Sequence, residues 1–139
     1  MAKGELELAI ADFSETLRRK PDDSAAYHQR GKAFQKQGDL TGALADFDQA
    51  IALDPDDPGT YHNRGIAYKQ LGMFDEAIAD FTYVLHLDPN YAEAYFNRHL
   101  TYLQRGAPGD DRLARRDMDR YRRLLQRRPT DNSKSPSSE

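Results

Sequence analysis

The chain has 139 residues, a net charge of −3, 38% hydrophobic residues, 31% charged residues and no cysteine. This length allows one domain with a core of its own, and the lack of cysteine excludes disulfides and thiolate chemistry. The sequence contains no run of 18 apolar residues and no signal-like apolar stretch near its start, so we expect neither a membrane span nor a secretory signal. A cytoplasmic protein is the default expectation, with export of a processed fragment left open.

A block of residues recurs along the chain at a step of 34. Proline, phenylalanine, alanine and aspartate all return at this step: Pro21, Pro55 and Pro89; Phe13, Phe47 and Phe81; Ala9, Ala43 and Ala77; Asp12, Asp46 and Asp80. A period of 20–50 residues predicts a stacked array of small structural units. Such an array offers an extended surface more readily than a catalytic pocket.

The first predicted element is a half repeat at residues 5–20. Gly4-Glu5-Leu6 aligns with Gly38-Asp39-Leu40, so the chain opens with only the second helix of a unit. We expect the absent first helix to leave an apolar stripe partly uncovered: Leu6, Ile10, Phe13 and Leu17. Either the chain is an excerpt of a longer array, or a partner or another copy of the chain covers this face.

Residues 24–57 and 58–91 each predict a pair of antiparallel helices. In the first pair, Ser24 is a suitable N-cap and Gly38 a suitable helix end, and Asp54-Pro55 stops the second helix. Apolar and aromatic residues recur at spacings of three and four on both helices. Residues 58–91 repeat the same pattern.

The last predicted unit, at residues 92–128, departs from the pattern. Its first helix covers about 93–105, with His99 in place of glycine, which should loosen the contact between the two helices. The Gly106–Gly109 segment then breaks the chain before a helix at about 110–127. If Pro129 answers Pro89, the step is 40, which predicts six inserted residues. The Ser- and Pro-rich tail at 129–139 is predicted to be disordered.

The repeated pattern resembles that of the tetratricopeptide repeat. It reads Tyr27, Gly31, Phe34, Ala43, Phe47 and Pro55 in one unit, and Tyr61, Gly65, Tyr68, Ala77, Phe81 and Pro89 in the next. The resemblance implies an all-α, right-handed solenoid of about three and a half repeats over residues 1–128. It also implies a non-enzymatic scaffold that binds other proteins. The glycines would let the two helices of a unit approach closely.

In tetratricopeptide arrays the first helices line a concave groove that holds partner peptides. By register, this groove would present His28, Gln29, Lys32, Lys36, His62, Asn63, Ile66, Lys69, Gln70, Glu93, Phe96, Asn97 and Leu100. Lys32, Lys36 and Lys69 form a cationic group that suits a segment bearing acids. Phe96, Leu100 and Leu103 form an apolar group, which either serves the partner or packs under the final helix.

The resemblance also gives a negative expectation. Arrays that grip the C-terminal carboxylates of chaperones use a clamp of Lys, Asn, Asn, Lys and Arg. The corresponding places here hold His28, Lys32, Asn63, Glu93 and Asn97, of which only Asn63 matches. Because Glu93 reverses a charge, we expect the groove not to bind chaperone tails.

The remaining polar patterns favour structure over catalysis. Arg30 with Asp46, and Arg64 with Asp80, are predicted to be ion pairs between the two helices of a unit. His28 and His62 lack further ligands for a metal, so no cofactor or metal is expected.

Charge is distributed unevenly along the chain. Residues 1–104 hold 10 Lys and Arg against 17 Asp and Glu, whereas residues 105–128 hold 9 Arg against 4 Asp. We favour a solvated capping face for the Arg-rich last helix over an acidic partner or nucleic acid. Self-assembly through the open N-terminal face is the main alternative function.

Overall fold

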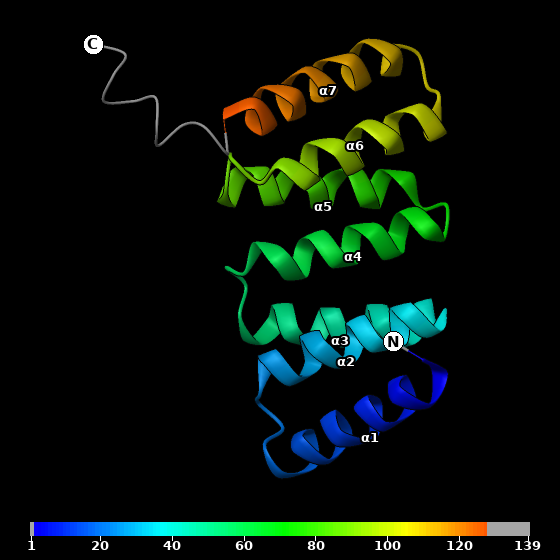
Figure 1. Ribbon diagram of the computed structural model, residues 1–139, viewed down its shortest axis with the longest axis vertical. Coiled ribbons are helices and arrows are strands. Elements are labelled where there is room, and N and C mark those ends of the chain that lie inside the picture. Colours follow the sequence, from blue (N-terminus) through cyan, green and yellow to red (C-terminus); the bar gives the residue numbers. More distant parts are fainter. Residues whose placement is uncertain (1, 128–139) are drawn as a thin grey trace, which may run out of the picture.

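The computed structural model describes residues 2–127 as α-helices joined by short turns. Figure 1 shows the helices stacked in chain order along the long axis, with α1 at one end and α7 at the other. The helices are α1 Lys3–Arg19, α2 Ser24–Gln37, α3 Leu40–Leu53, α4 Pro58–Gln70, α5 Phe74–Leu87, α6 Ala92–Arg105 and α7 Asp110–Arg127. The all-α solenoid of the sequence analysis is confirmed, and none of the described helices is long and apolar enough to cross a membrane.

Aspartates, rather than serine, cap the starts of three helices. The carboxylates of Asp23, Asp39 and Asp57 each accept a hydrogen bond from a backbone N–H in the first turn, at 2.9–3.0 Å. The choice of Ser24 as the N-cap of α2 was therefore wrong by one residue, since Ser24 is already helical. At the other end of α2, Gly38 adopts a left-handed conformation with φ of 89° and ends the helix as expected.

The two helices of each central unit meet where a glycine faces a phenylalanine ring. A Cβ atom added to Gly31 would lie 2.7 Å from the Phe47 ring, and one added to Gly65 would lie 2.7 Å from the Phe81 ring. Both rings are fully buried. A larger residue at the repeated glycine would therefore clash with the ring. This agrees with the close helix approach expected from the sequence.

The last unit has three extra residues between its paired arginine and aspartate. In the earlier units the paired arginine and aspartate are 16 residues apart, whereas Arg98 pairs with Asp117 at a separation of 19. The extra residues lie in the turn between α6 and α7 and in the adjoining helix ends. The six inserted residues counted from Pro129 stay a prediction, because Pro129 and the predicted disordered tail lie outside the described residues.

His99 ties the last two helices together. Its Nδ1 lies 2.7 Å from the backbone oxygen of Ala114 on α7, within hydrogen-bond distance. By the register of Asp117, Met118 occupies the place of Phe47 and Phe81. On α6, His99 is larger than the glycine it replaces, and on α7 the flexible Met118 replaces the phenylalanine ring. The hydrogen bond from His99 offsets the looser helix contact that the sequence predicted.

The N-terminal half repeat is less exposed than expected. Leu6 and Leu17 are buried although no helix precedes α1 in the described residues, and Ile10 and Phe13 are half-buried. Helix α1 packs on α2, and this contact supplies the burial. The uncovered part of α1 is therefore narrower than the stripe that the sequence predicted.

Candidate functional site

The first helices of successive units lie close to one another. Helix α2 contacts α4, and α4 contacts α6, in addition to the contacts that each makes with its neighbours in the chain. Elements that approach more closely along a stack lie on the inner side of its curve. Helices α2, α4 and α6 carry the predicted groove residues.

Four of the predicted groove residues form a hydrogen-bonded ladder between units. Asn63 Nδ2 lies 2.8 Å from His28 Nε2, and Asn97 Nδ2 lies 2.9 Å from His62 Nε2. An amide nitrogen can only donate, so each Nε2 is an unprotonated acceptor and both imidazoles are neutral. The sequence placed these residues in one groove but did not foresee that they join the units.

Burial reinforces the neutral state of both histidines. Burial lowers the pKa of His28 below its ordinary value, opposed mainly by the nearby carboxylate of Asp57. His28 Nδ1 also lies 3.1 Å from Thr60 Oγ1, a partner that the sequence analysis missed. Burial likewise lowers the pKa of His62, opposed by the charge and backbone of Glu93. These side chains therefore form polar contacts between units.

The predicted ion pairs are present and are part of a larger joint. Arg30 donates two hydrogen bonds to Asp46 at 2.7 and 2.8 Å, and Arg64 donates two to Asp80 at 2.9 and 2.8 Å. Arg30 also donates to Ser14 at 3.0 Å, and Arg64 to Asp48 at 2.9 Å, on the second helix of the preceding unit.

Aromatic rings complete each arginine joint. Each guanidinium lies between two rings, with 5.6–5.8 Å from its central carbon to each ring centroid in the first two joints. Arg98 repeats the joint with Asp117, Thr82, Tyr95 and Tyr102. Each arginine thus joins three consecutive helices, and these residues are structural.

Four polar side chains of α2 and α4 take no part in these joints. Gln29 and Lys36 are exposed, and Lys32 and Lys69 are half-buried. Gln29, Lys32 and Lys36 line a cleft of about 150 Å³ between α1 and α2. The structure therefore brings two of the three predicted lysines together, with Lys69 on α4. Ile66 is half-buried on α4, and Gln70 accepts a hydrogen bond from Gln35 at 3.0 Å.

The apolar group at the C-terminal end is divided between packing and exposure. The ring of Phe96 lies against Tyr121 of α7, with centroids 5.0 Å apart, so this residue packs under the final helix. Leu100 is half-buried, and Leu103 is 49% exposed. Glu93 is exposed in the first turn of α6. Of the two readings left open by the sequence, packing holds for Phe96.

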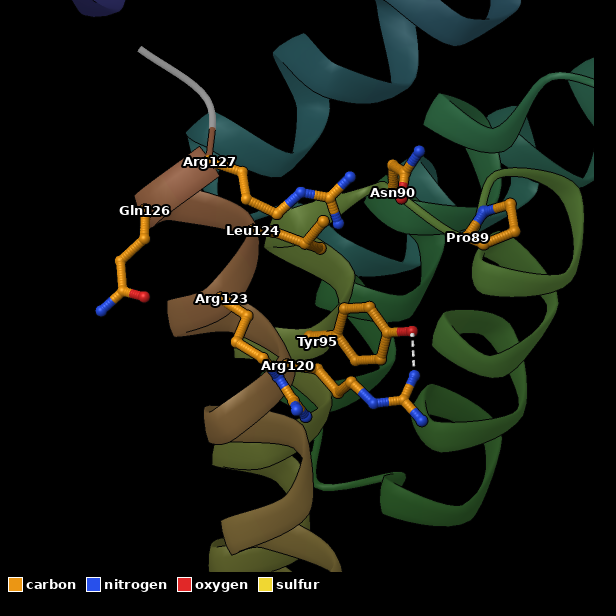
Figure 2. Close-up of a pocket in the computed structure, with 8 residues that line it drawn as sticks. All are labelled: Pro89, Asn90, Tyr95, Arg120, Arg123, Leu124, Gln126 and Arg127. Atoms are coloured by element: carbon orange, nitrogen blue, oxygen red, sulfur yellow. Dashed lines mark hydrogen bonds between the residues drawn. The ribbon is translucent and has the colours of Figure 1, made fainter. Parts of the chain in front are cut away.

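Helix α7 presents a more basic surface than its sequence suggests. Asp110 and Asp117 are buried in ion pairs with Arg105 and Arg98 of α6, so two of its four aspartates are withdrawn from the surface. Figure 2 shows the resulting cleft between α7 and the turn before α6. It has a volume of about 330 Å³ and is lined by Pro89, Asn90, Tyr95, Arg120, Arg123, Leu124, Gln126 and Arg127.

This cleft was missed by the sequence analysis. Arg120 reaches across it, with a terminal nitrogen 3.4 Å from the Tyr95 hydroxyl. The spacing of Arg120, Arg123 and Arg127 by three and four residues was the available signal, because such residues share one side of a helix. Within residues 2–127, no group of three or more His, Asp or Glu residues is arranged to hold a metal ion.

Sequence profiles match the two central units. The profile described as TPR repeat matches residues 36–72, and the one described as tetratricopeptide repeat matches residues 58–91. Residues 36–91 therefore carry tetratricopeptide repeats. No curated protein matches it by sequence.

Several solved structures share the fold. MamA (41-end) from Desulfovibrio magneticus RS-1 matches with a TM-score of 0.83 and 19% identity over 91% of this chain and 70% of that chain. The first TPR of Spaghetti (RPAP3), bound to the HSP90 peptide SRMEEVD, matches with a TM-score of 0.73 and 25% identity over 76% and 83%. The Arabidopsis OM64 TPR domain matches with a TM-score of 0.68 and 24% identity over 70% and 81%. These likenesses show the fold of this chain.

Proposed function

We propose that the inner side of α2, α4 and α6 binds an extended, acid-bearing segment of another protein. The proposal rests on the side chains of these helices that take no part in the histidine, asparagine and arginine joints. Lys32 and Lys36 supply positive charge at one end, and Lys69 continues it on the next unit. Ile66 and Leu100 supply apolar contacts at the same register on α4 and α6.

The occupied joints limit what this groove can hold. Asn63 and Asn97 are committed to His28 and His62, so their amides are held within the array. Glu93 adds a negative charge at the start of α6, where a carboxylate ligand would be repelled. The proposed ligand therefore carries its acids toward the α2 end of the groove and is not a chaperone-type C-terminal carboxylate.

A peptide library tests the groove directly. Peptides of 12 residues selected on the whole chain should be enriched in Asp and Glu. The double variant Lys32→Glu/Lys69→Glu should bind the selected peptides about tenfold more weakly, since charge-assisted contacts are lost and reversed. The matched control is Lys20→Glu/Arg112→Glu, which makes the same charge change at two exposed positions outside the groove. Equal affinity of the groove variant and the control would refute the assignment.

The arginine cleft of Figure 2 is a second candidate surface for acidic groups. Three arginines line it, and the nearby Asp117 is buried in its ion pair with Arg98. In the same assay, Arg120→Glu/Arg123→Glu should weaken any peptide that binds there while leaving groove peptides unaffected. If this variant binds every selected peptide as tightly as the wild type does, α7 serves only as a solvated capping helix.

A further inference from the structure

Helix α1 carries the docking positions of a second helix but leaves them uncovered. Ala9, Asp12 and Phe13 lie one 34-residue step before Ala43, Asp46 and Phe47, and two steps before Ala77, Asp80 and Phe81. The six later residues are at most 5% exposed, because a first helix packs over them. In α1, by contrast, Ala9 and Phe13 are half-buried and Asp12 is exposed.

Asp12 occupies the aspartate position of an arginine joint without the arginine. Asp46, Asp80 and Asp117 each accept two hydrogen bonds from an arginine of the first helix of their unit. Among residues 2–127, Asp12 has no ion-pair partner. Leu8 lies one turn before Asp12 on the same side of α1 and is 68% exposed.

Gln29 occupies an open position of the histidine ladder. It lies one step before Asn63 and two before Asn97, whose amides donate to His28 and His62. Gln29 is exposed and lines the 150 Å³ cleft together with Ala9 and Phe13. A histidine on a helix placed over α1 would meet its amide as His28 meets Asn63.

We propose that the α1 face, formed by Leu8, Ala9, Asp12, Phe13 and Gln29, binds a partner helix with the pattern Tyr-His-x-Arg-Gly. The chain carries this pattern twice, at Tyr27–Gly31 and at Tyr61–Gly65, each docked on the equivalent positions of the next helix. The partner's arginine pairs with Asp12, its histidine accepts from Gln29, and its glycine lies over the ring of Phe13. This is a second binding surface, which meets the groove at Gln29.

The face selects its occupant by charge and by size. The exposed carboxylate of Asp12 favours a basic residue and disfavours an acid at the same place. The glycine is required because a Cβ over the equivalent ring of Phe47 would come within 2.7 Å of it. An acidic residue of the occupant is therefore disfavoured beside Asp12.

The probe for this site is a peptide with the sequence of residues 24–37. A staple between the positions of Ala25 and Gln29, both exposed in α2, keeps it helical, because a free 14-residue helix is marginal in water. Titrated against the full chain, it should bind at 1:1 stoichiometry. Asp12→Arg in the chain should weaken binding at least about tenfold, since a charge-assisted pair is replaced by repulsion.

Matched changes separate a specific joint from non-specific contact. A peptide with Arg30→Asp should bind the Asp12→Arg chain better than the wild-type peptide does, and a peptide with Gly31→Leu should bind neither chain. The control Asp22→Arg makes the same charge change at an exposed turn residue and should bind like the wild type. Because Asp12 is exposed and unpaired, Asp12→Arg should keep its helical circular dichroism.

Three results would overturn the proposal. One is no binding of the stapled peptide, and another is equal binding to the wild-type and Asp12→Arg chains. The third is a concentration-dependent dimer of the chain alone, seen by sedimentation, that Asp12→Arg dissociates, because the occupant would then be a second copy rather than a partner helix.

Discussion

At the scale of single residues, the arginine joints hold the units together. Asp80 is 5% exposed and accepts two hydrogen bonds from Arg64. Replacing Arg64 with leucine would leave a buried carboxylate without its partner, which costs about 3 kcal/mol of unfolding free energy. The control is Arg18→Leu, which removes an exposed ion pair with Glu15 and should leave stability unchanged. Urea denaturation measures both, and an equal effect of the two changes would contradict the structural role of Arg64.

The histidine ladder makes stability depend on pH. Burial holds the pKa of His28 and His62 below the ordinary value of 6.5, so the unfolded chain takes up protons there before the folded chain does. Unfolding free energy should therefore fall as the pH drops below about 6.5 and should gain nothing from these groups at higher pH. In the variant His28→Gln/His62→Gln this dependence should be weaker. An unchanged pH profile of urea midpoints would count against the neutral ladder.

At the scale of elements, the approach of two helices depends on one glycine. Gly31→Ala improves helix propensity by up to about 1 kcal/mol but places a Cβ against the buried ring of Phe47. Overpacking of this kind costs about 1–3 kcal/mol, so we expect a net loss of stability. The control Gly4→Ala meets no atom within 4 Å and should be neutral or slightly stabilising. Thermal unfolding of both variants decides this, and a stabilised Gly31→Ala protein would contradict the close contact.

The helices and the ion pairs could be predicted from the sequence because both repeat at a fixed step. The fixed step does not hold in the last unit, where three residues are inserted between Arg98 and Asp117. The histidine ladder could not be predicted from the sequence. A polar residue at a groove position has the same sequence pattern whether it binds a ligand or forms a hydrogen bond with the next unit. Burial of Asp110 and Asp117 could not be predicted either, because acidic residues among arginines are typical of a solvent-exposed helix. Only the structure shows that they pair with Arg105 and Arg98 of α6.

At the scale of the whole molecule, the proposed binding surfaces lie on different parts of the stack. The arginine joints and the histidine ladder fix the spacing of the units, so a segment bound along α2, α4 and α6 meets a preformed surface and loses less entropy on binding. Helix α1, which carries most of the α1 face, lies at one end of the stack, and α7, which lines the arginine cleft, lies at the other (Figure 1). The central claim is that partner segments run along the inner side of the first helices.

Site-specific photo-crosslinking tests this claim most directly. A photoreactive amino acid is placed singly at Gln29 or Ile66 on the first helices, or at the exposed Ala45 or Ala79 on the second helices, and each protein is irradiated with a library-selected acidic peptide. The account predicts crosslinks from positions 29 and 66 and none from 45 and 79. Crosslinks from positions 45 and 79, with none from 29 and 66, would contradict it.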